Sequence, residues 1–240
     1  MKKISIFLFL LLFIFTACKD EKTLKSSYTV GCDMIYPFVY KDGTGKLTGF
    51  EYDLLMEIAK KSGFKLNFIE KKFEQIIPGV VKNELDIGIN SYSMTDERKQ
   101  MVDFSEHYMY SDVVTISNRE NVVLNIKAPI YGVTKGTYFL SLIQDIKNVK
   151  LLEESSNEKV IEMLLSKELD YAVFDKNIAM KYIEKHPELY IKEILKRDYI
   201  GFVFSKELGE KFKRKVSEAL LKIDSDGTLA KLKAKYNIQE

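Results

Sequence analysis

The sequence predicts an α/β protein of two lobes, each built on a largely parallel sheet. Short apolar strands alternate with amphipathic helices through the first half, and the same alternation restarts at Val113. Similar four-residue stretches, 83–86 and 167–170, precede a buried strand in each half. Both strands run into polar residues, and open α/β sheets bind their ligands at the carboxyl ends of strands. We therefore expect two lobes whose strand ends face each other across a cleft.

The first half is expected to supply three strands and three helices. The strands are the mainly apolar runs 28–32, 65–69 and 86–90. A helix capped by Asp53 should end at Gly63, because glycine accepts the left-handed conformation that closes many helices. A second helix covers 74–83 despite Pro78, and a third follows Thr95. Strands that alternate with helices in this way form parallel sheets with crossover helices.

The second half is expected to repeat the pattern. Its predicted strands are 113–117, 130–134, 149–152, 171–174, 190–194 and 200–204. Its predicted helices are 138–146, 159–166 and a segment that follows Asp175 and ends at Glu184. Ser155 and Glu158 fit a capping box for the second of these helices. Two further amphipathic helices near the C-terminus have apolar faces at Phe212, Val216, Leu220 and Ile223 and at Leu229, Leu232 and Tyr236.

One stretch of the first half points to chemistry. Thr95 is expected to cap a helix whose first turn holds two acids, followed by Arg98. A cation so close to a helix start has the wrong sign for the helix dipole. Together with free N–H groups and the hydroxyl-rich turn 91–93, Arg98 would form a site for an anion, most naturally a carboxylate. The alternative is that Arg98 pairs in solvent with Glu97 or Asp103.

Composition and charge limit the classes of function. Hydrophobic residues make up 46% of the chain and charged residues 30%, as in ordinary soluble globular proteins. The formal net charge is +2, and the lysines are interleaved with acids. Because no basic stripe stands apart from neighbouring carboxylates, nucleic acid is not expected as a partner.

The N-terminus has the pattern of an export signal. Two lysines precede a twelve-residue apolar run, 4–15, which is shorter than the about 20 residues that span a bilayer. Small residues then precede Cys18, as in bacterial lipoprotein signals, in which the cysteine is acylated. An aliphatic residue is usual where Phe15 stands, so a plain signal peptide or a membrane anchor remains the alternative. We expect a signal peptide over 1–17 and a lipidated tether over 18–27.

Cysteine and histidine are too few for a metal centre. Acylation of Cys18 would leave Cys32 as the only thiol of the mature chain, without a disulfide partner. Cys32 lies in an apolar strand and is expected to be a small core residue. His107 and His186 are the only histidines, so neither a metal site nor another cofactor is predicted.

Four sequence motifs occur in an order that resembles one protein family. They are VGCD at 30–33 with YPF at 36–38, GFEYDL at 49–54, MTDER at 94–98 with VDFS at 102–105, and DGTLAK at 226–231. On these motifs the chain resembles, over 28–237, the periplasmic solute-binding proteins that serve ABC importers of polar amino acids. The resemblance implies a monomeric amino-acid-binding protein without catalysis, which works beside a permease in the inner membrane.

The family implies two lobes joined by two hinge strands, with the ligand between the lobes. Lobe 1 would comprise 28–109 and 201–240, and lobe 2 would comprise 110–200. The hinge strands would lie near 108–112 and 197–200. Closure of the hinge around the ligand would be the change that the permease recognises.

The family also implies roles for individual residues. Arg98 would bind the α-carboxylate of the ligand, helped by the hydroxyl and the backbone of Ser93. The carbonyl of Ser91 and the carboxylate of Asp175 would hold the α-ammonium, with Tyr92 beside them. Opposite lobes would then grip the opposite charges of a zwitterion, so that binding drives closure.

The second-lobe turn and two aromatic residues would complete the pocket. The turn of Gly136, Thr137 and Tyr138, at a predicted helix start, would give N–H groups to the carboxylate. Tyr138 is bulkier than the residues common there and would reshape the pocket. Phe73 matches an aromatic wall under the ligand side chain and Tyr36 the opposite wall, although either could instead be core.

The choice among amino acids would depend on the loop that begins at Asp33. This loop is one residue shorter than in several family members, so Asp33 and Cys32 compete for the position that contacts the ligand side chain. Asp33 in the cleft would favour side chains with N–H donors, such as lysine, arginine, glutamine or histidine. The alternative is that Asp33 is only a turn residue.

An enzyme on the same scaffold is the competing interpretation. Dehydratases that act on cyclohexadienyl acids resemble this family. If this chain were such an enzyme, Asp175 would serve as its general acid. The sequence contains no activated nucleophile motif. It also lacks a second cation for a dicarboxylate such as prephenate, unless Lys135 supplies it. The transport interpretation is therefore preferred.

Overall fold

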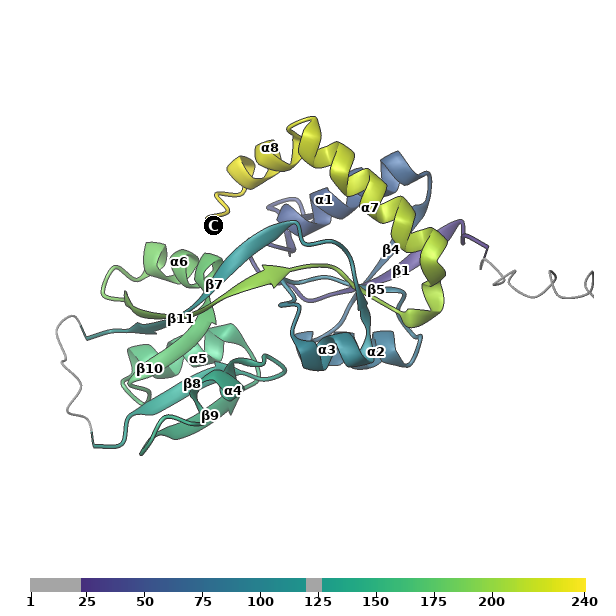
Figure 1. The fold of residues 1–240 in the computed structure, drawn as a ribbon. Helices are drawn as coiled ribbons and strands as arrows, with labels where there is room; N and C mark the ends of the chain where they lie inside the picture. The colour runs from purple at the N-terminus through teal and green to yellow at the C-terminus, as the bar shows by residue number, and fades with distance from the viewer. Residues whose placement is uncertain (1–22, 120–126) are drawn as a thin grey trace, which may run out of the picture.

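The computed structural model describes residues 23–119 and 127–240, whose elements form two α/β lobes connected by two long strands (Figure 1). The predicted signal peptide and the first half of the predicted tether, 18–22 with Cys18, lie outside the described residues. Within 23–119 and 127–240, every helix is too short or too polar to span a bilayer.

The strands are β1 (Ser27–Cys32), β2 (Tyr40–Lys41), β3 (Leu47–Thr48), β4 (Lys65–Glu70), β5 (Ile87–Gly88), β6 (Asp103–Phe104), β7 (Met109–Ser117), β8 (Ile130–Thr134), β9 (Lys150–Glu154), β10 (Tyr171–Asp175), β11 (Tyr190–Ile200) and β12 (Val203–Phe204). The helices are α1 (Phe50–Ser62), α2 (Phe73–Val81), α3 (Asp96–Met101), α4 (Phe139–Ile143), α5 (Asn157–Leu165), α6 (Lys176–Lys185), α7 (Gly209–Ser225) and α8 (Thr228–Lys235), with a 3-10 turn at Lys206–Leu208.

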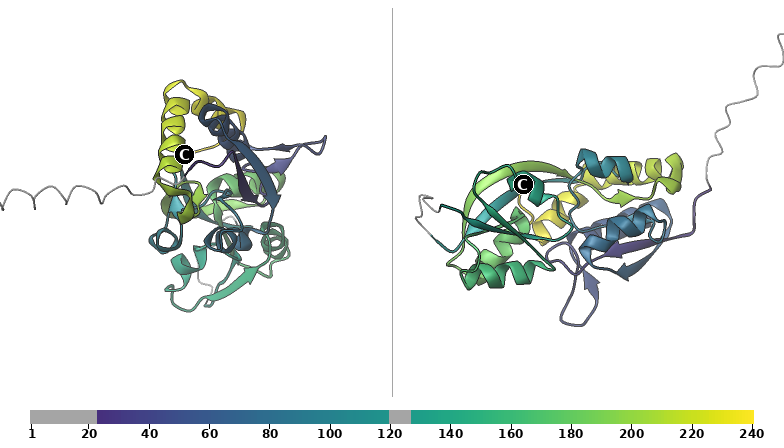
Figure 2. Two further views of the ribbon diagram at one scale, coloured as in Figure 1. Left: turned by 90° about the vertical axis from the view of Figure 1, so that its right-hand side faces the viewer. Right: turned by 90° about the horizontal axis from the view of Figure 1, so that it is seen from below.

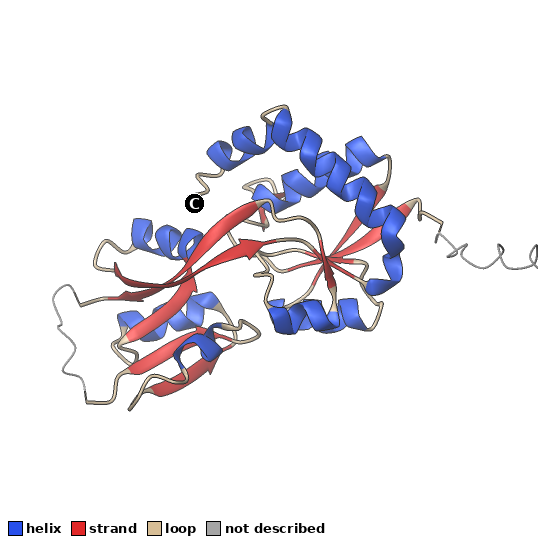
Figure 3. Ribbon diagram, in the orientation of Figure 1, coloured by secondary structure: helices blue, strands red, loops and turns tan. Residues whose placement is uncertain are grey.

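The first sheet has the strand order β4-β1-β5-β12-β6. Strand β1 pairs in parallel with β4 and β5, which confirms the predicted crossover arrangement, whereas β12 is antiparallel to its neighbours. Helices α1 and α7 share a hydrophobic core on one face of the sheet, and α2 packs on the other face (Figures 2 and 3). This sheet with α1–α3, α7 and α8 is called lobe 1 below.

The second sheet has the strand order β11-β7-β10-β8-β9. Strand β8 is parallel to β9 and β10, and β7 pairs antiparallel with β10. Helices α5 and α6 share one apolar cluster with β7 and β10, and α4 lies in the cluster on the opposite face. This sheet with α4–α6 is called lobe 2. Both sheets are open, so the mixed two-lobed fold predicted from the sequence is confirmed.

The two connecting strands pair with each other along their whole length. The antiparallel register of β7 and β11 runs from the pair Ser117 and Tyr190 to the pair Met109 and Ile200. The prediction of a strand that ends at 194 was wrong, because β11 continues to Ile200 with two register irregularities. Arg197 and Asp112 face each other in this ladder, and the Arg197 Nε atom lies 2.8 Å from the Asp112 carboxylate.

Two helix starts also differ from the predictions. Helix α1 begins after Gly49 rather than at Asp53, because the φ of 129° at Gly49 is not helical. Glycine is needed at this position, since a Cβ there would lie 2.3 Å from the Phe38 carbonyl oxygen. Asp53 instead accepts hydrogen bonds from Tyr236 and from the Lys235 ammonium. Helix α5 is capped by Ser156, whose hydroxyl accepts from the N–H of Lys159, rather than by the predicted Ser155.

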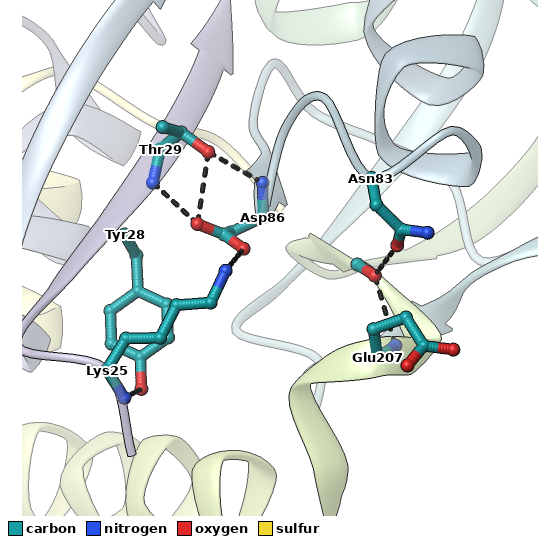
Figure 4. A network of polar contacts seen from close by, with 7 residues as sticks. Lys25, Tyr28, Thr29, Asn83, Asp86 and Glu207 are labelled. Atoms are coloured by element: carbon teal, nitrogen blue, oxygen red, sulfur yellow. Dashed lines mark hydrogen bonds and ion pairs between the residues drawn. The ribbon is translucent and has the colours of Figure 1, made fainter. Parts of the chain in front are cut away.

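A polar network anchors the first described residues to lobe 1 (Figure 4). The Asp86 carboxylate accepts from the Thr29 N–H at 2.9 Å, the Thr29 hydroxyl at 3.0 Å and the Lys25 ammonium at 2.6 Å. Lys25 lies in the segment predicted as tether, so part of that segment is held against the sheet. The register between β1 and β5 is fixed at the same point, because the Asp86 N–H donates to the Thr29 carbonyl.

Candidate functional site

Two hydrogen bonds join the lobes where the sequence predicted a ligand cleft. The Ser91 hydroxyl of lobe 1 donates to the Asp175 carboxylate of lobe 2 at 3.1 Å. The Arg98 guanidinium of lobe 1 donates to the Gly136 carbonyl of lobe 2 at 3.3 Å. The structure therefore brings Ser91, Arg98 and Asp175 to one interface, in a closed arrangement of the lobes.

Arg98 is buried, which excludes the alternative of a solvent-exposed ion pair. It is 6% exposed and is the third residue of α3, which is capped as predicted by the Thr95 hydroxyl. The guanidinium also donates to the Ser93 carbonyl at 3.1 Å and lies over the Tyr92 ring, 5.1 Å from its centre. Burial lowers the pKa of Arg98. A guanidinium has five N–H donors, so these two carbonyls leave capacity for a bidentate carboxylate.

Asp175 ends β10 and caps α6. Its carboxylate is 6% exposed and accepts from the Asn177 N–H at 2.8 Å as well as from Ser91. Burial raises the pKa of Asp175, while the hydrogen bonds from Ser111, Asn177 and Ser91 lower it. A buried carboxylate of this kind is stabilised by a cationic partner, because desolvation of the charge is then compensated.

The turn that carries Ser91 and Ser93 is attached to a hinge strand. The Met94 N–H donates to the Tyr199 carbonyl at 3.0 Å, and the Gly201 N–H donates to the Tyr92 carbonyl at 3.2 Å. Ser93 is buried and forms a β-bridge with Ile200. A shift of the end of β11 is therefore transmitted directly to this turn.

The two predicted aromatic walls lie in different places. Phe73 starts α2 and stacks on Tyr92 with ring centres 4.7 Å apart, while the Tyr92 hydroxyl donates to the Phe73 carbonyl. Tyr36 is 45% exposed and packs against Tyr40, with the ammonium of Lys181 from lobe 2 over its ring. Phe73 lines both cleft cavities described below, and Tyr36 lines neither. The structure thus does not bring Tyr36 together with Phe73.

Asp33, rather than Cys32, faces the cleft. Cys32 is 1% exposed, and burial raises its pKa to about 12, as expected of a core thiol. Asp33 lines a cavity between the lobes, but its carboxylate also accepts from the N–H groups of Phe73 and Met34, each at 2.8 Å. The loop therefore uses Asp33 both as a turn residue and as a cap for the start of α2.

The second-lobe turn differs from its predicted role in detail. Thr137 directs both its N–H and its hydroxyl to the Thr134 carbonyl, at 3.2 and 2.7 Å. The Tyr138 hydroxyl donates to Asp198 on β11, and its ring centre lies 5.8 Å from the Arg98 guanidinium. The backbone of Gly136 packs on α2, because a Cβ there would lie 2.7 Å from the Cα atom of Glu74. Tyr138 thus lies beside Arg98, but its hydroxyl is hydrogen-bonded to the hinge strand β11.

Two cavities meet at Phe73 and Glu74. The larger, of 480 Å³, is lined by Arg98, Tyr92 and the turn 136–138. The smaller, of 210 Å³, is lined by Asp33 and by polar residues of both lobes. Its charged residues are Asp33, Glu70, Lys72, Glu74, Lys135 and Glu158. Acids therefore outnumber bases around the smaller cavity.

Sequence reasoning missed two residues that shape this interface. Glu74 lies against Gly136 of the predicted second-lobe turn, and Glu51 holds the turn that presents Ser91. The glycine at 136 is a turn signal that the sequence offers, and its φ is positive. Its contact with Glu74, however, joins residues far apart in the chain. Among the described residues, no group of three or more His, Cys, Asp or Glu side chains is placed to hold a metal ion.

Known proteins share both the sequence and the arrangement. The family model of bacterial extracellular solute-binding proteins, family 3, matches residues 28–239. A probable histidine-binding protein of Campylobacter jejuni is 30% identical over 213 residues, which cover 85% of this chain and 81% of that protein.

Two solved structures are also similar. An ancestral arginine-binding protein bound to arginine has a TM-score of 0.80 at 27% identity, covering 89% of this chain and 99% of that chain. An ancestral amino acid-binding protein described as a precursor of cyclohexadienyl dehydratase has a TM-score of 0.77 at 27% identity, covering 88% and 95%. From the family match and the two-lobed fold, the chain belongs to the bacterial extracellular solute-binding proteins of family 3.

Proposed function

We propose that the protein is the substrate-binding component of an ABC importer and captures a free amino acid between its lobes. The observation that carries the proposal is the pair of buried, oppositely charged groups on opposite lobes, Arg98 and Asp175. An amino acid has one negative and one positive group on the same carbon. A cleft that places a guanidinium and a carboxylate on facing walls matches both groups and desolvates both pairs on closure.

Binding would be coupled to closure through the hinge. In the closed arrangement Arg98 donates to the Gly136 carbonyl and Ser91 donates to Asp175, so each charged group has a protein partner from the other lobe. An amino acid would supply a carboxylate to the first and an ammonium to the second. Because β11 is hydrogen-bonded to the turn that carries these residues, ligand contact and hinge angle would change together.

We propose a polar or cationic amino acid as the ligand. The smaller cavity has four acids and two lysines on its walls, and Glu74 lies 3.9 Å from the Lys135 ammonium. Phe73 would contact the aliphatic or ring portion of the side chain, and Asp33 would accept from its N–H donors. The histidine-binding and arginine-bound relatives support this class of ligand.

A dehydratase is the second candidate, and two observations favour it. Burial raises the pKa of Asp175, as a general acid requires, and one similar structure is an ancestor of a dehydratase. We nevertheless propose a protein without catalysis. A dicarboxylate would need a second cation near Arg98, and Lys135 is placed beside Glu74 instead.

The remaining features of the proposal follow from the family and the N-terminal sequence. The mature chain would be a monomer, tethered through acylated Cys18 on the outer face of a membrane and delivering its ligand to a permease. The two lobes would divide at 109/110 and 200/201, which lie beside the paired ends of β7 and β11. The protein would need no cofactor.

A thermal-shift screen of the twenty amino acids tests the proposal, because a ligand of the native state raises the melting temperature. At least one polar or cationic amino acid should raise it, and Arg98→Ala should abolish every shift. Arg214→Ala, at an exposed position on α7, is the matched control and should bind as the wild type does. Turnover of prephenate without any amino acid shift would overturn the transport proposal.

A further inference from the structure

Glu51 is a fully buried acid that the ligand contacts described above do not use. It is the second residue of α1 and is 0% exposed. Its carboxylate accepts from the Asn90 N–H at 2.6 Å, from the Ser91 N–H at 2.7 Å and from the Tyr108 hydroxyl. Two of its three partners therefore belong to the turn that presents Ser91 to Asp175.

That turn has an unfavourable backbone conformation. Asn90 has a φ of 128° and Ser91 a φ of 55°, values that residues other than glycine rarely adopt. The Asn90 side chain additionally accepts from the Asp33 N–H at 2.7 Å and donates to the Asp33 carbonyl at 2.9 Å. The conformation held by Glu51 thus supports both the Ser91 contact across the cleft and the loop that carries Asp33.

We propose that Glu51 is a positioning residue, whose ionised carboxylate holds the Asn90–Ser91 turn in the binding conformation, so that amino acid capture is coupled to release of its proton. The coupling rests on the proposed amino acid ligand. The positioning role does not, because it concerns contacts that exist within lobe 1.

The hydrogen-bond geometry favours the ionised form of Glu51. One Glu51 oxygen faces the Ser91 N–H and the Tyr108 hydroxyl, and the other faces the Asn90 N–H. A neutral carboxyl would carry an added O–H donor, whereas all three partners of Glu51 are themselves donors. Of these partners, the Tyr108 hydroxyl could turn to accept that proton, but its own hydrogen would then lose Glu51 as acceptor, and a buried donor without a partner is costly.

The charges around Glu51 give the sign of the coupling. Burial raises its pKa to about 7, against the three hydrogen bonds that lower it, and Asp175 on the facing lobe raises it further. The titratable groups coupled to it are Tyr108, Asp175, Tyr92 and Cys32. Burial raises the pKa of the two tyrosines and the thiol, so these groups are neutral near pH 7. The ammonium of a ligand beside Asp175 would therefore favour the ionised Glu51.

Calorimetric titration of L-arginine between pH 5.5 and 8.5 tests the coupling, with L-glutamine as a probe without side-chain charge. Affinity for both should rise with pH through about 7 and then level off, with a slope of at most tenfold per pH unit for one linked proton. Glu51→Gln should bind at least tenfold more weakly at pH 8 with no such slope. Glu57→Gln, on the same helix, should keep the wild-type profile. A Glu51→Gln profile parallel to that of the wild type would overturn the coupling.

A ligand-free NMR titration tests the positioning role separately. The Glu51 carboxyl of the wild type should titrate near pH 7, and the amide signals of Asn90 and Ser91 should change along the same curve. If neither probe binds but these signals titrate together, the proposed ligand class fails while the positioning role stands. A Glu51 carboxyl that titrates at its ordinary value, or amide signals that do not follow it, would overturn the role even where the Gln variant does not fold.

Discussion

Replacing Arg98 with alanine removes the only proposed cationic contact for the ligand carboxylate. Arg98 is 6% exposed, so a bound carboxylate would lose most of its water and would have little solvent to screen its charge if the guanidinium were absent. Removing one partner of a buried ion pair costs about 3–5 kcal/mol, which corresponds to roughly two to four powers of ten in affinity. A micromolar ligand, held by about 8 kcal/mol, would weaken to a Kd between about 0.1 and 10 mM.

Calorimetry with the amino acid that gives the largest thermal shift measures this loss. Arg98→Lys separates charge from geometry, because an ammonium keeps the charge but cannot form the two parallel hydrogen bonds of a guanidinium. It should recover part of the affinity, while Arg214→Ala should lose none. Binding to Arg98→Ala within tenfold of the wild type would refute the assignment of Arg98 to the ligand carboxylate.

Three further predictions follow from the cleft. Gly136→Ala should weaken binding at least tenfold in calorimetry, because its Cβ would lie 2.7 Å from the Glu74 Cα atom and oppose closure, whereas Gly45→Ala, at a similar φ in open space, should not. Asp33→Asn should weaken arginine binding more than glutamine binding, and an unchanged ratio would remove Asp33 from the specificity pocket. The folded-state pKa of Glu51 is raised from 4.5 to about 7, so its contribution to stability is present below about pH 4.5 and is lost as pH rises through 7. In urea unfolding, the stability of the wild type relative to Glu51→Gln should therefore fall by about 2–3 kcal/mol between pH 5 and pH 8, and a constant difference would contradict the raised pKa.

The parts of the fold with strong local patterns could be predicted from the sequence. The crossover order of β1, β4 and β5 follows from alternating apolar strands and amphipathic helices. The cap at Thr95 follows from its hydroxyl and the acids behind it. The prediction ended the long strand β11 too early. Because β11 connects the lobes and has many polar and exposed positions, it lacks the regular apolar alternation of a core strand. Its regularity comes from pairing with β7.

The site could be predicted only where one residue type implies one chemistry. A cation at the start of α3 and an acid at the end of β10 were recognisable, and the structure buries both at the interface of the lobes. The position of Tyr36 depends on its packing against Tyr40, and Glu51 is buried by contacts with residues about 40 and 57 positions away. Neither long-range contact has a local signature.

The proposal that Arg98 and Asp175 bind the two ends of an amino acid is tested most directly by removing the two charges of the ligand in turn. The amino acid that gives the largest thermal shift should be compared in calorimetry with its α-carboxamide and its N-acetyl derivative. If Arg98 binds the carboxylate and Asp175 the ammonium, each derivative should bind at least about a hundredfold more weakly than the parent amino acid. Equal binding of either derivative would contradict the proposal that opposite lobes grip the two ends of a zwitterion.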